Sequence, residues 1–416
     1  MGFESFIWHS EEPEDCPFAA SGDWRDIEFT GRSRHYSAGD TWYPSWASDG
    51  RMYSPFTDGI TEGVTCNSAE TIDASEEHFV VNKMTSTGQA VMEGDDPENL
   101  KLIPLENQRA LAYPYGGRYP CGSLVYNGVW YYGTYCLGPY AATRYGEHVY
   151  NWPQLGPFVG FRISYDYGKT WTPCPFTPEH PIFGENGLCG YPVKIGAPHF
   201  VDFGQNMCYS PDGKAYLIAH GSDLKFYPIS ENHFAHNSWI TGDQIYLLRV
   251  EPTPESINDV SAYEFFAGKN KNGSPIWSRK FEDIQPLLEW PYHMGCVTVT
   301  YNAPLKRYFM AVTDGKDTCS RMDTYILESS SITGEWRLVA YLRNFGEQAY
   351  FVNFPSKFIS EDGEKMWICY SGNFAKNWNE NEIRANPPES AYGLVLQEIR
   401  LCKRRNSNRI KYSGMK

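Results

Sequence analysis

Two aspartates bracket the stretch 39–59, the part of the sequence best suited to chemistry. Asp40 and Asp58 are equally distant from Asp49-Gly50, a dipeptide that favours a tight turn because glycine tolerates positive φ. If this turn closes a hairpin, both carboxylates lie at its open end. Two neighbouring carboxylates supply an acid and a base or nucleophile, the pair that cleaves a glycosidic bond. The alternative is that each aspartate only caps the end of a strand.

Aromatic side chains accompany this pair. Trp42, Tyr43 and Trp46 lie on the first arm of the expected hairpin, and flat aromatic faces suit the C–H groups of a sugar. We predict that these three side chains bind substrate. The competing interpretation is that they pack in the core, as most aromatic residues of such a chain must.

Six more polar residues are candidates for the same site. They are Asp202 as a third catalytic carboxylate, and Arg118, His199, His220, His293 and Glu347 as substrate ligands. A third carboxylate can tune the pKa of a catalytic partner or bind a hydroxyl group. The alternative is a structural role, because an aspartate at the end of a strand or a lone histidine more often forms hydrogen bonds within the fold than acts on a ligand. The histidines are too widely spaced for a recognisable metal motif, so we predict neither a metal nor a cofactor.

The net charge of the chain limits the classes of molecule that it is expected to bind. The 416 residues carry a net charge of −14, which repels nucleic acid and anionic membrane surfaces at long range. No apolar run reaches the roughly 18 residues that span a bilayer. We therefore expect an oligosaccharide or glycoside as partner, and neither nucleic acid nor membrane. The sequence leaves the oligomeric state open.

The cysteines point to a compartment. Eleven of them are scattered without a C-x-x-C pair, which fits buried thiols in a reducing environment better than a secreted disulfide framework. The N-terminus shows no basic segment followed by an apolar one, so we expect no secretory signal. These features predict a cytoplasmic protein.

Short strands must position the candidate residues. Aromatics make up 16% of the chain, which also has 37 glycines and 28 prolines, a mixture that suits many strands joined by turns. Strand–turn–strand patterns recur, for example around Asn127-Gly128. Five such units begin near residues 36, 120, 197, 295 and 355, and no linker divides the chain. We predict an all-β fold, a single five-bladed β-propeller domain over residues 1–416, with a two-sheet sandwich as the alternative.

The segment 164–171, SYDYGKTW, resembles the Asp box of sialidases and other propeller glycosidases. In this motif Asp166 is expected to accept backbone N–H groups of the turn, Gly168 to permit the tight conformation, and Trp171 to pack on the sheet. The resemblance implies a structural role for Asp166, away from any active site.

A broader resemblance covers most of the chain. Segments 39–42, 57–59, 247–250, 262–268, 276–278 and 297–302 are similar, in this order, to a propeller family of unknown function that includes bacterial endo-D-arabinanases. Segment 328–336 also resembles a turn of five-bladed arabinanases and xylosidases, with Glu335 where proline is usual. The resemblance implies a five-bladed propeller with an axial pocket. It also implies that Asp40 and Asp58 carry hydrolysis, and it leaves the sugar open.

We therefore predict a glycoside hydrolase that uses paired aspartates in an axial pocket, with arabinofuranosyl-type sugars as one candidate substrate. The rival from another class is a non-catalytic carbohydrate-binding propeller, which would need the aromatic residues and not the carboxylates. A sialidase-like hydrolase would need a cluster of arginines to hold a carboxylate. A polysaccharide lyase would act on an acidic sugar, which the negative net charge disfavours.

Overall fold

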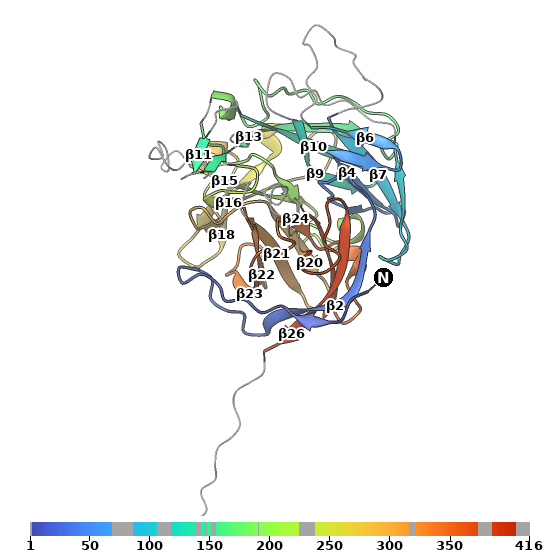
Figure 1. Cartoon of the computed structure of the whole chain (residues 1–416). Coiled ribbons are helices and arrows are strands. Elements are labelled where there is room, and N and C mark those ends of the chain that lie inside the picture. The colour runs from blue at the N-terminus through green and yellow to red at the C-terminus, as the bar shows by residue number, and fades with distance from the viewer. Residues whose placement is uncertain are drawn as a thin grey trace, which may run out of the picture.

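The chain forms a five-bladed β-propeller, with five antiparallel sheets arranged around one axis (Figure 1). The computed structural model describes residues 2–68, 86–105, 118–138, 155–189, 191–223, 238–315, 321–372 and 385–404, and the backbone of β11 (Thr143–Tyr145) and β12 (His148–Tyr150). The predicted all-β, single-domain propeller is confirmed. None of the helices among the described residues is long and apolar enough to cross a membrane.

Each blade is one sheet. Blade 1 contains β3 (Ser45–Trp46), β4 (Met52–Phe56), β7 (Gly88–Glu93) and β8 (Lys101–Pro104), with the hairpin β5 (Gly59–Thr61) and β6 (Val64–Cys66) beside it; blade 2 contains β9 (Arg118–Tyr126), β10 (Val129–Leu137) and β13 (Leu155–Ser164); blade 3 contains β14 (His199–Phe200), β15 (Ala215–Gly221), β16 (Gln244–Val250), β17 (Glu264–Lys269), β18 (Pro275–Ser278) and β19 (Leu288–Glu289). Blade 4 contains β20 (Val297–Asn302), β21 (Arg307–Asp314), β22 (Asp323–Ser329) and β23 (Arg337–Leu342); blade 5 contains β24 (Ala349–Asn353), β25 (Lys365–Gly372), β26 (Val395–Lys403), β2 (Trp24–His35) and β1 (Phe6–Ile7). Short 3-10 turns lie between strands at η2 (Gly187–Cys189), η3 (Gln205–Met207), η6 (Val260–Ala262), η7 (Phe281–Asp283) and η8 (Ser356–Phe358).

The innermost strands give the axis two distinct ends. Strands β9, β14, β20 and β24 are neighbours around the axis, and β20 and β24 lie near the middle of the ring in Figure 1. The parallel bridge between Asp202 and Thr300 shows that inner strands of adjacent blades run in the same direction. We call the end at which inner strands begin the proximal end, and the end at which they finish the distal end.

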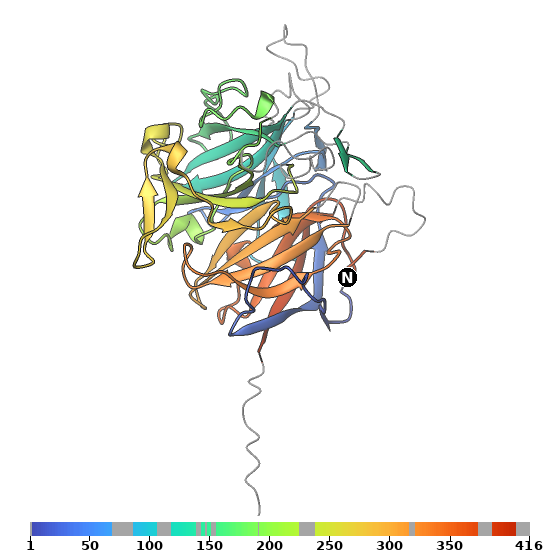
Figure 2. The ribbon, with the colours of Figure 1, turned by 90° about the vertical axis from the view of Figure 1, so that its left-hand side faces the viewer.

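The N-terminal strand completes the last blade, which the sequence did not predict. β2 pairs antiparallel with β26, with Ile27 opposite Leu401 and Phe29 opposite Ile399. Figure 2 shows this N-terminal strand, in blue, lying along the orange and red strands of the C-terminal half. Because β2 covers an edge of β26 that would otherwise be open, the two ends of the chain close the ring together.

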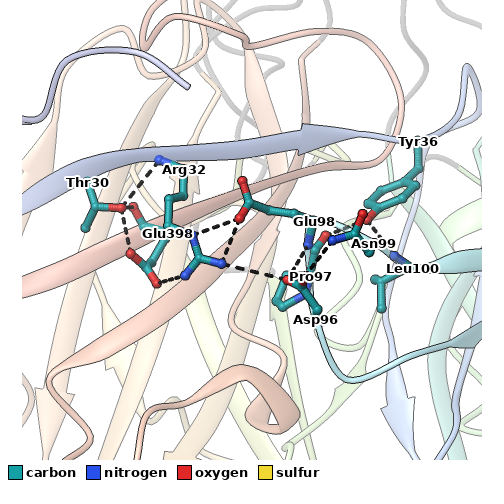
Figure 3. Close-up of polar contacts among 9 residues, drawn as sticks. All are labelled: Thr30, Arg32, Tyr36, Asp96, Pro97, Glu98, Asn99, Leu100 and Glu398. Carbon is teal, nitrogen blue, oxygen red and sulfur yellow. Dashed lines mark hydrogen bonds and ion pairs between the residues drawn. The ribbon is translucent and has the colours of Figure 1, made fainter. Parts of the chain in front are cut away.

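A polar network marks the seam between blades 5 and 1 (Figure 3). Arg32 on β2 forms ion pairs of 2.7 Å with Glu398 on β26 and of 2.7 Å with Glu98, which lies between β7 and β8. Nearby, the hydroxyl of Tyr36 donates to the Pro97 carbonyl and accepts from the Leu100 amide. Through these ion pairs the side chain of Arg32, on the N-terminal strand β2, links the last blade to the first.

Candidate active site

The first hairpin brings the two aspartates together at the proximal end. Ser45 pairs with Tyr53 across the turn, and Asp40 forms an antiparallel bridge with Thr57, with N–H to O distances of 2.8 and 3.0 Å. The predicted hairpin is confirmed. Its register is symmetric about the turn at Ser45–Tyr53 and Trp46–Met52, and it is shifted by one residue at Asp40, which faces Thr57 and not Asp58. Asp58 follows Thr57 directly and so lies beside Asp40.

Asp40 is buried, with 6% of its surface exposed. Its Oδ2 accepts hydrogen bonds from Tyr350 and Tyr392, at 2.5 and 3.2 Å, and its Oδ1 accepts one of 2.8 Å from Thr41. Burial, together with the charge of Asp58, raises the pKa of Asp40 to about 8, although these hydrogen bonds oppose the shift. At neutral pH the Asp40 carboxyl therefore holds a proton.

Asp58 has a different environment. It is partly exposed, and its two oxygens accept hydrogen bonds from the backbone N–H and the hydroxyl of Ser68, at 2.6 and 2.7 Å. Burial raises the pKa of Asp58, while both bonds from Ser68 lower it. Because hydrogen bonds from a backbone amide favour the carboxylate, we assign the first ionisation of the pair to Asp58. The two neighbouring carboxyl groups therefore lose their protons in sequence, Asp58 before Asp40.

Blade 5 supplies the residues that hold this pair, and the sequence analysis missed them. The hydroxyl of Tyr392 lies 2.5 Å from the carbonyl oxygen of Asp58 as well as 3.2 Å from Asp40. Tyr350 comes from β24, and Tyr392 from the segment between β25 and β26. These contacts join residues more than 300 positions apart, so no local spacing could reveal them.

The backbone around the pair is strained. Thr41 has φ of 64° and Asp58 has φ of 47°, and positive φ is unfavourable for residues other than glycine, most of all for a β-branched one. Such conformations persist only where surrounding contacts impose them, and they gather at functional sites.

Aromatic side chains fill the axis on the distal side of the pair. Tyr43 stacks on His199 with 3.8 Å between ring centroids and meets Phe351 at 5.5 Å, while Trp239 packs edge-on to Tyr350 at 4.9 Å. Tyr43 and His199 are buried, and burial holds the pKa of His199 well below its usual range. The structure thus places Tyr43 and His199, both predicted to bind substrate, in a buried aromatic cluster on the distal side of the pair.

Asp202 lies at the distal end, apart from Asp40 and Asp58. It lines a cavity of about 40 Å³ that also contacts Tyr43 and His199. Its carboxylate accepts hydrogen bonds from the N–H and hydroxyl of Ser356, both 2.7 Å, and from the Gly204 N–H at 2.9 Å. Tyr350 and Ser356 stand at opposite ends of β24, so Asp202 ties blades 3 and 5 together at the end of the axis away from the pair.

The two tryptophans are held in the core between blades 1 and 5. Trp42 has 2% of its surface exposed, stacks on Phe56 at 5.3 Å between centroids, and donates its indole N–H to the Gly39 carbonyl at 2.7 Å. Trp46 is partly buried against the same cluster. The structure brings neither indole to the axis, because both rings fill the space between adjacent sheets.

Three other candidates come from blades 3, 4 and 5, and their polar contacts run to residues other than the pair. His220 is buried in β15, its Nε2 lies 2.9 Å from the Ser238 carbonyl, and burial lowers its pKa to about 4. His293 lies just before β20, 2.6 Å from an oxygen of Asp314. Glu347, just before β24, pairs with Arg321. Among the described residues, no group of three or more His, Cys, Asp or Glu side chains is placed to hold a metal ion.

Arg118 is the first residue of β9 and so lies at the proximal end. Its backbone N–H donates to the carbonyl of Ser68, at 2.9 Å, and Ser68 in turn binds the carboxylate of Asp58. Of the substrate ligands expected from the sequence, Arg118 is the one that the hydrogen bonds connect to the pair.

The turn at 164–171 has the contacts expected of it. Asp166 accepts backbone N–H groups from Lys169 and Thr170, at 3.1 and 2.8 Å, and these bonds lower its pKa to about 2. Gly168 has φ of 89°, and Trp171 packs against Trp130. Its relation to the sialidase motif stays a prediction.

Comparison with known proteins gives structural likenesses only, since no protein-family model and no curated protein matches the sequence. Similar solved structures include the α-L-arabinofuranosidase of Podospora anserina in complex with cellotriose (12% identity, TM-score 0.41, 88% of this chain and 92% of that chain). Others are a GH43_1 enzyme from Xanthomonas citri (13%, 0.43, 88% and 89%) and a family 117 glycoside hydrolase of Zobellia galactanivorans (11%, 0.43, 89% and 89%). Likenesses at this level carry no argument about activity.

Proposed function

We propose that this chain is a glycoside hydrolase that cleaves an oligosaccharide at the proximal end of its axis. The observation that carries the proposal is the placement of Asp40 beside Asp58, where one hydroxyl, that of Tyr392, reaches the carboxyl group of Asp40 and the backbone carbonyl of Asp58. Pairs of carboxyl groups whose surroundings separate their pKa values provide the acid and the base of glycosidic cleavage.

In the proposed mechanism Asp40 acts as the general acid. Its proton passes to the glycosidic oxygen as the bond to the anomeric carbon breaks, which leaves an alcohol and an ionised Asp40. Asp58 either activates a water molecule or attacks the anomeric carbon itself. The hydroxyl groups of Tyr350 and Tyr392 then stabilise the new charge on Asp40, because both lie within hydrogen-bond distance of Oδ2.

The substrate class and the compartment are also proposals. The order of motifs that resembles endo-D-arabinanases favours an arabinofuranosyl-type sugar. Nine cysteines in the described part of the chain are free thiols, which supports a reducing compartment such as the cytoplasm. In that compartment the enzyme would act on short saccharides.

The test is turnover by the full chain on matched panels of arabinosides, xylosides and galactosides, with Asp40→Asn and Asp58→Asn beside the wild type. Each substitution keeps the shape of the side chain and removes its ability to exchange a proton. We expect a loss of about 10²–10⁴-fold in kcat for each variant. Unchanged turnover in both variants refutes the site, and binding without turnover on every sugar favours a carbohydrate-binding propeller.

A further inference from the structure

The N-terminal segment 10–21 lies against the outer strand of blade 4 and is attached to it at both ends. At one end the hydroxyl of Ser10 donates to the carbonyl of Tyr341. At the other end the carbonyl of Ala19 accepts a hydrogen bond of 2.9 Å from the backbone N–H of Leu338. Both partners belong to β23, an edge strand of its sheet. The segment therefore covers a strand edge that would otherwise be open.

The middle of this segment reaches a histidine at the seam between blades 3 and 4. Phe18 packs edge-on against Trp290, with 5.9 Å between ring centroids, and Trp290 stacks on His293 at 4.0 Å. The indole N–H of Trp290 donates to Oδ2 of Asp15, at 3.3 Å. Trp290 and His293 lie between β19, in blade 3, and β20, in blade 4. Asp15 is thus held next to the imidazole of His293.

His293 has a carboxylate near each nitrogen of its ring. Nδ1 lies 2.6 Å from Oδ2 of Asp314, the last residue of β21, whose side chain is 1% exposed. Nε2 lies 3.9 Å from Oδ2 of Asp15, whose side chain is 69% exposed. The first distance is that of a hydrogen bond, whereas the second is within the range of an ion pair only.

The protonation of the ring decides whether the second contact is attractive. An ionised carboxylate accepts hydrogen bonds and cannot donate them, so Nδ1 carries the proton in its bond to Asp314. In the neutral ring Nε2 then presents a lone pair to the carboxylate of Asp15, and the two repel each other. A second proton makes Nε2 a donor and places a positive charge between two negative ones.

Further ionisable side chains lie on the elements packed around this histidine: Glu12 and Cys16 in the N-terminal segment, Asp243 before β16, and Asp323 and Tyr325 on β22. Asp243 accepts a hydrogen bond from the Tyr292 N–H at 3.0 Å, and Asp323 accepts one from the Tyr341 hydroxyl at 2.7 Å. Burial raises the pKa of the Tyr325 phenol and of the Cys16 thiol, so both are uncharged at neutral pH. The carboxylates that a protonated His293 meets directly are those of Asp314 and Asp15.

We propose that His293 fastens the N-terminal segment to blade 4 when it gains a proton, by joining Asp314 on β21 to Asp15. Histidine is the side chain whose charge ordinarily changes between about pH 5 and pH 8. The segment 10–21 contains four acidic residues and no lysine or arginine, so the carboxylate of Asp314 repels it unless a cation lies between them. Mild acid therefore tightens the segment against the seam, and mild alkali loosens it. This inference does not depend on the proposed hydrolase function.

The experiment is hydrogen exchange of the full chain, measured by mass spectrometry at about pH 5.5 and about pH 8 and corrected for the intrinsic effect of pH on exchange. The amides of residues 14–21 should be about 3- to 10-fold better protected at the lower pH, as expected for one partly exposed ion pair. Asp15→Asn removes the charge, keeps an oxygen for the indole of Trp290, and should abolish this difference. His293→Gln should abolish it as well.

His9→Gln is the matched control. His9 precedes the same segment and lies 3.6 Å from Asp26, so its loss should leave the pH dependence of residues 14–21 unchanged. The inference is overturned if the wild type is equally protected at both pH values, if Asp15→Asn keeps the difference, or if His9→Gln removes it. Because the side chain of Asp15 is exposed, Asp15→Asn decides the question even if His293→Gln does not fold.

Discussion

Asp40 keeps its proton at neutral pH because it is buried beside the charge of a second aspartate. The two tyrosines that bind its Oδ2 limit the shift, since they stabilise the ionised form. The chemistry of the pair is thus set by side chains from both the first and the last blade.

Removing one of these hydrogen bonds should raise the pKa of Asp40 further. In Tyr350→Phe the ionised carboxylate loses a donor, so the alkaline limb of the kcat/KM profile should move to higher pH, by on the order of one pH unit. The control is Tyr370→Phe, whose hydroxyl binds Ser390 and not Asp40. An alkaline limb that moves to lower pH in Tyr350→Phe, or that shifts equally in both variants, contradicts the assignment of Asp40 as the acid.

The same pKa predicts a dependence of stability on pH. The pKa of Asp40 is about 8 in the folded protein and about 3.9 in the unfolded chain. The folded state therefore binds the proton more tightly than the unfolded chain does. The contribution of this proton to the free energy of unfolding is fully present below about pH 4 and is lost as the pH rises through 8. The melting temperature of Asp40→Asn relative to that of the wild type should therefore rise by roughly 5 °C between pH 5 and pH 8. A constant difference across this range would show that Asp40 is already ionised at pH 5.

At the scale of elements, strand β24 has contacts to Asp40 at one end and to Asp202 at the other. The sequence analysis had assigned both aspartates to one catalytic site. Tyr350 reaches Asp40 from one end of the strand, and Ser356, just beyond the other end, binds Asp202. The sequence identified Asp202 as an acid at a strand end and could not say at which end of the axis that strand finishes.

Asp202→Ala tests this separation. The substitution leaves the backbone N–H groups of Gly204 and Ser356 without an acceptor, so the free energy of unfolding should fall by about 2–4 kcal/mol. Turnover per folded molecule should stay within about twofold of the wild type, because Asp202 is remote from the pair. A fall in kcat beyond about 10²-fold in a folded variant would return Asp202 to the catalytic groups.

Local patterns predicted the hairpins well. Asn127 and Gly128 both adopt positive φ at the tip of the β9–β10 hairpin, as the two-residue turn requires. The first hairpin was found for the same reason, and with it the position of Asp40 and Asp58 at one end. Trp42 was misplaced because alternation along a short strand does not say whether a side chain faces a neighbouring blade or the axis.

At the scale of the whole molecule, the ring is closed by the two ends of the chain. Strand β2 supplies an outer strand to the blade that β24, β25 and β26 begin. The sequence analysis started its first unit near residue 36 and so missed this strand. Pairing between residues such as Ile27 and Leu401, more than 350 positions apart, leaves no local trace in a single sequence.

Arg32 tests the closure of the ring. Arg32→Met removes its ion pairs with Glu98 and Glu398 and should lower the melting temperature by about 1–3 °C at low salt, and by less in 1 M salt, because exposed ion pairs are weak and screened. The control Arg25→Met removes one exposed pair of 3.8 Å on the same strand and should have little effect. Equal behaviour of both variants would mean that the network contributes nothing to the seam.

The most direct test of the paired aspartates is chemical rescue of Asp58→Gly. Because residue 58 has positive φ, glycine fits that backbone without strain. The account predicts a loss of about 10³-fold or more in kcat on an activated aryl glycoside, partly restored by added azide with release of a glycosyl azide. A folded Asp58→Gly variant that keeps full activity, or whose activity azide does not restore, would contradict it.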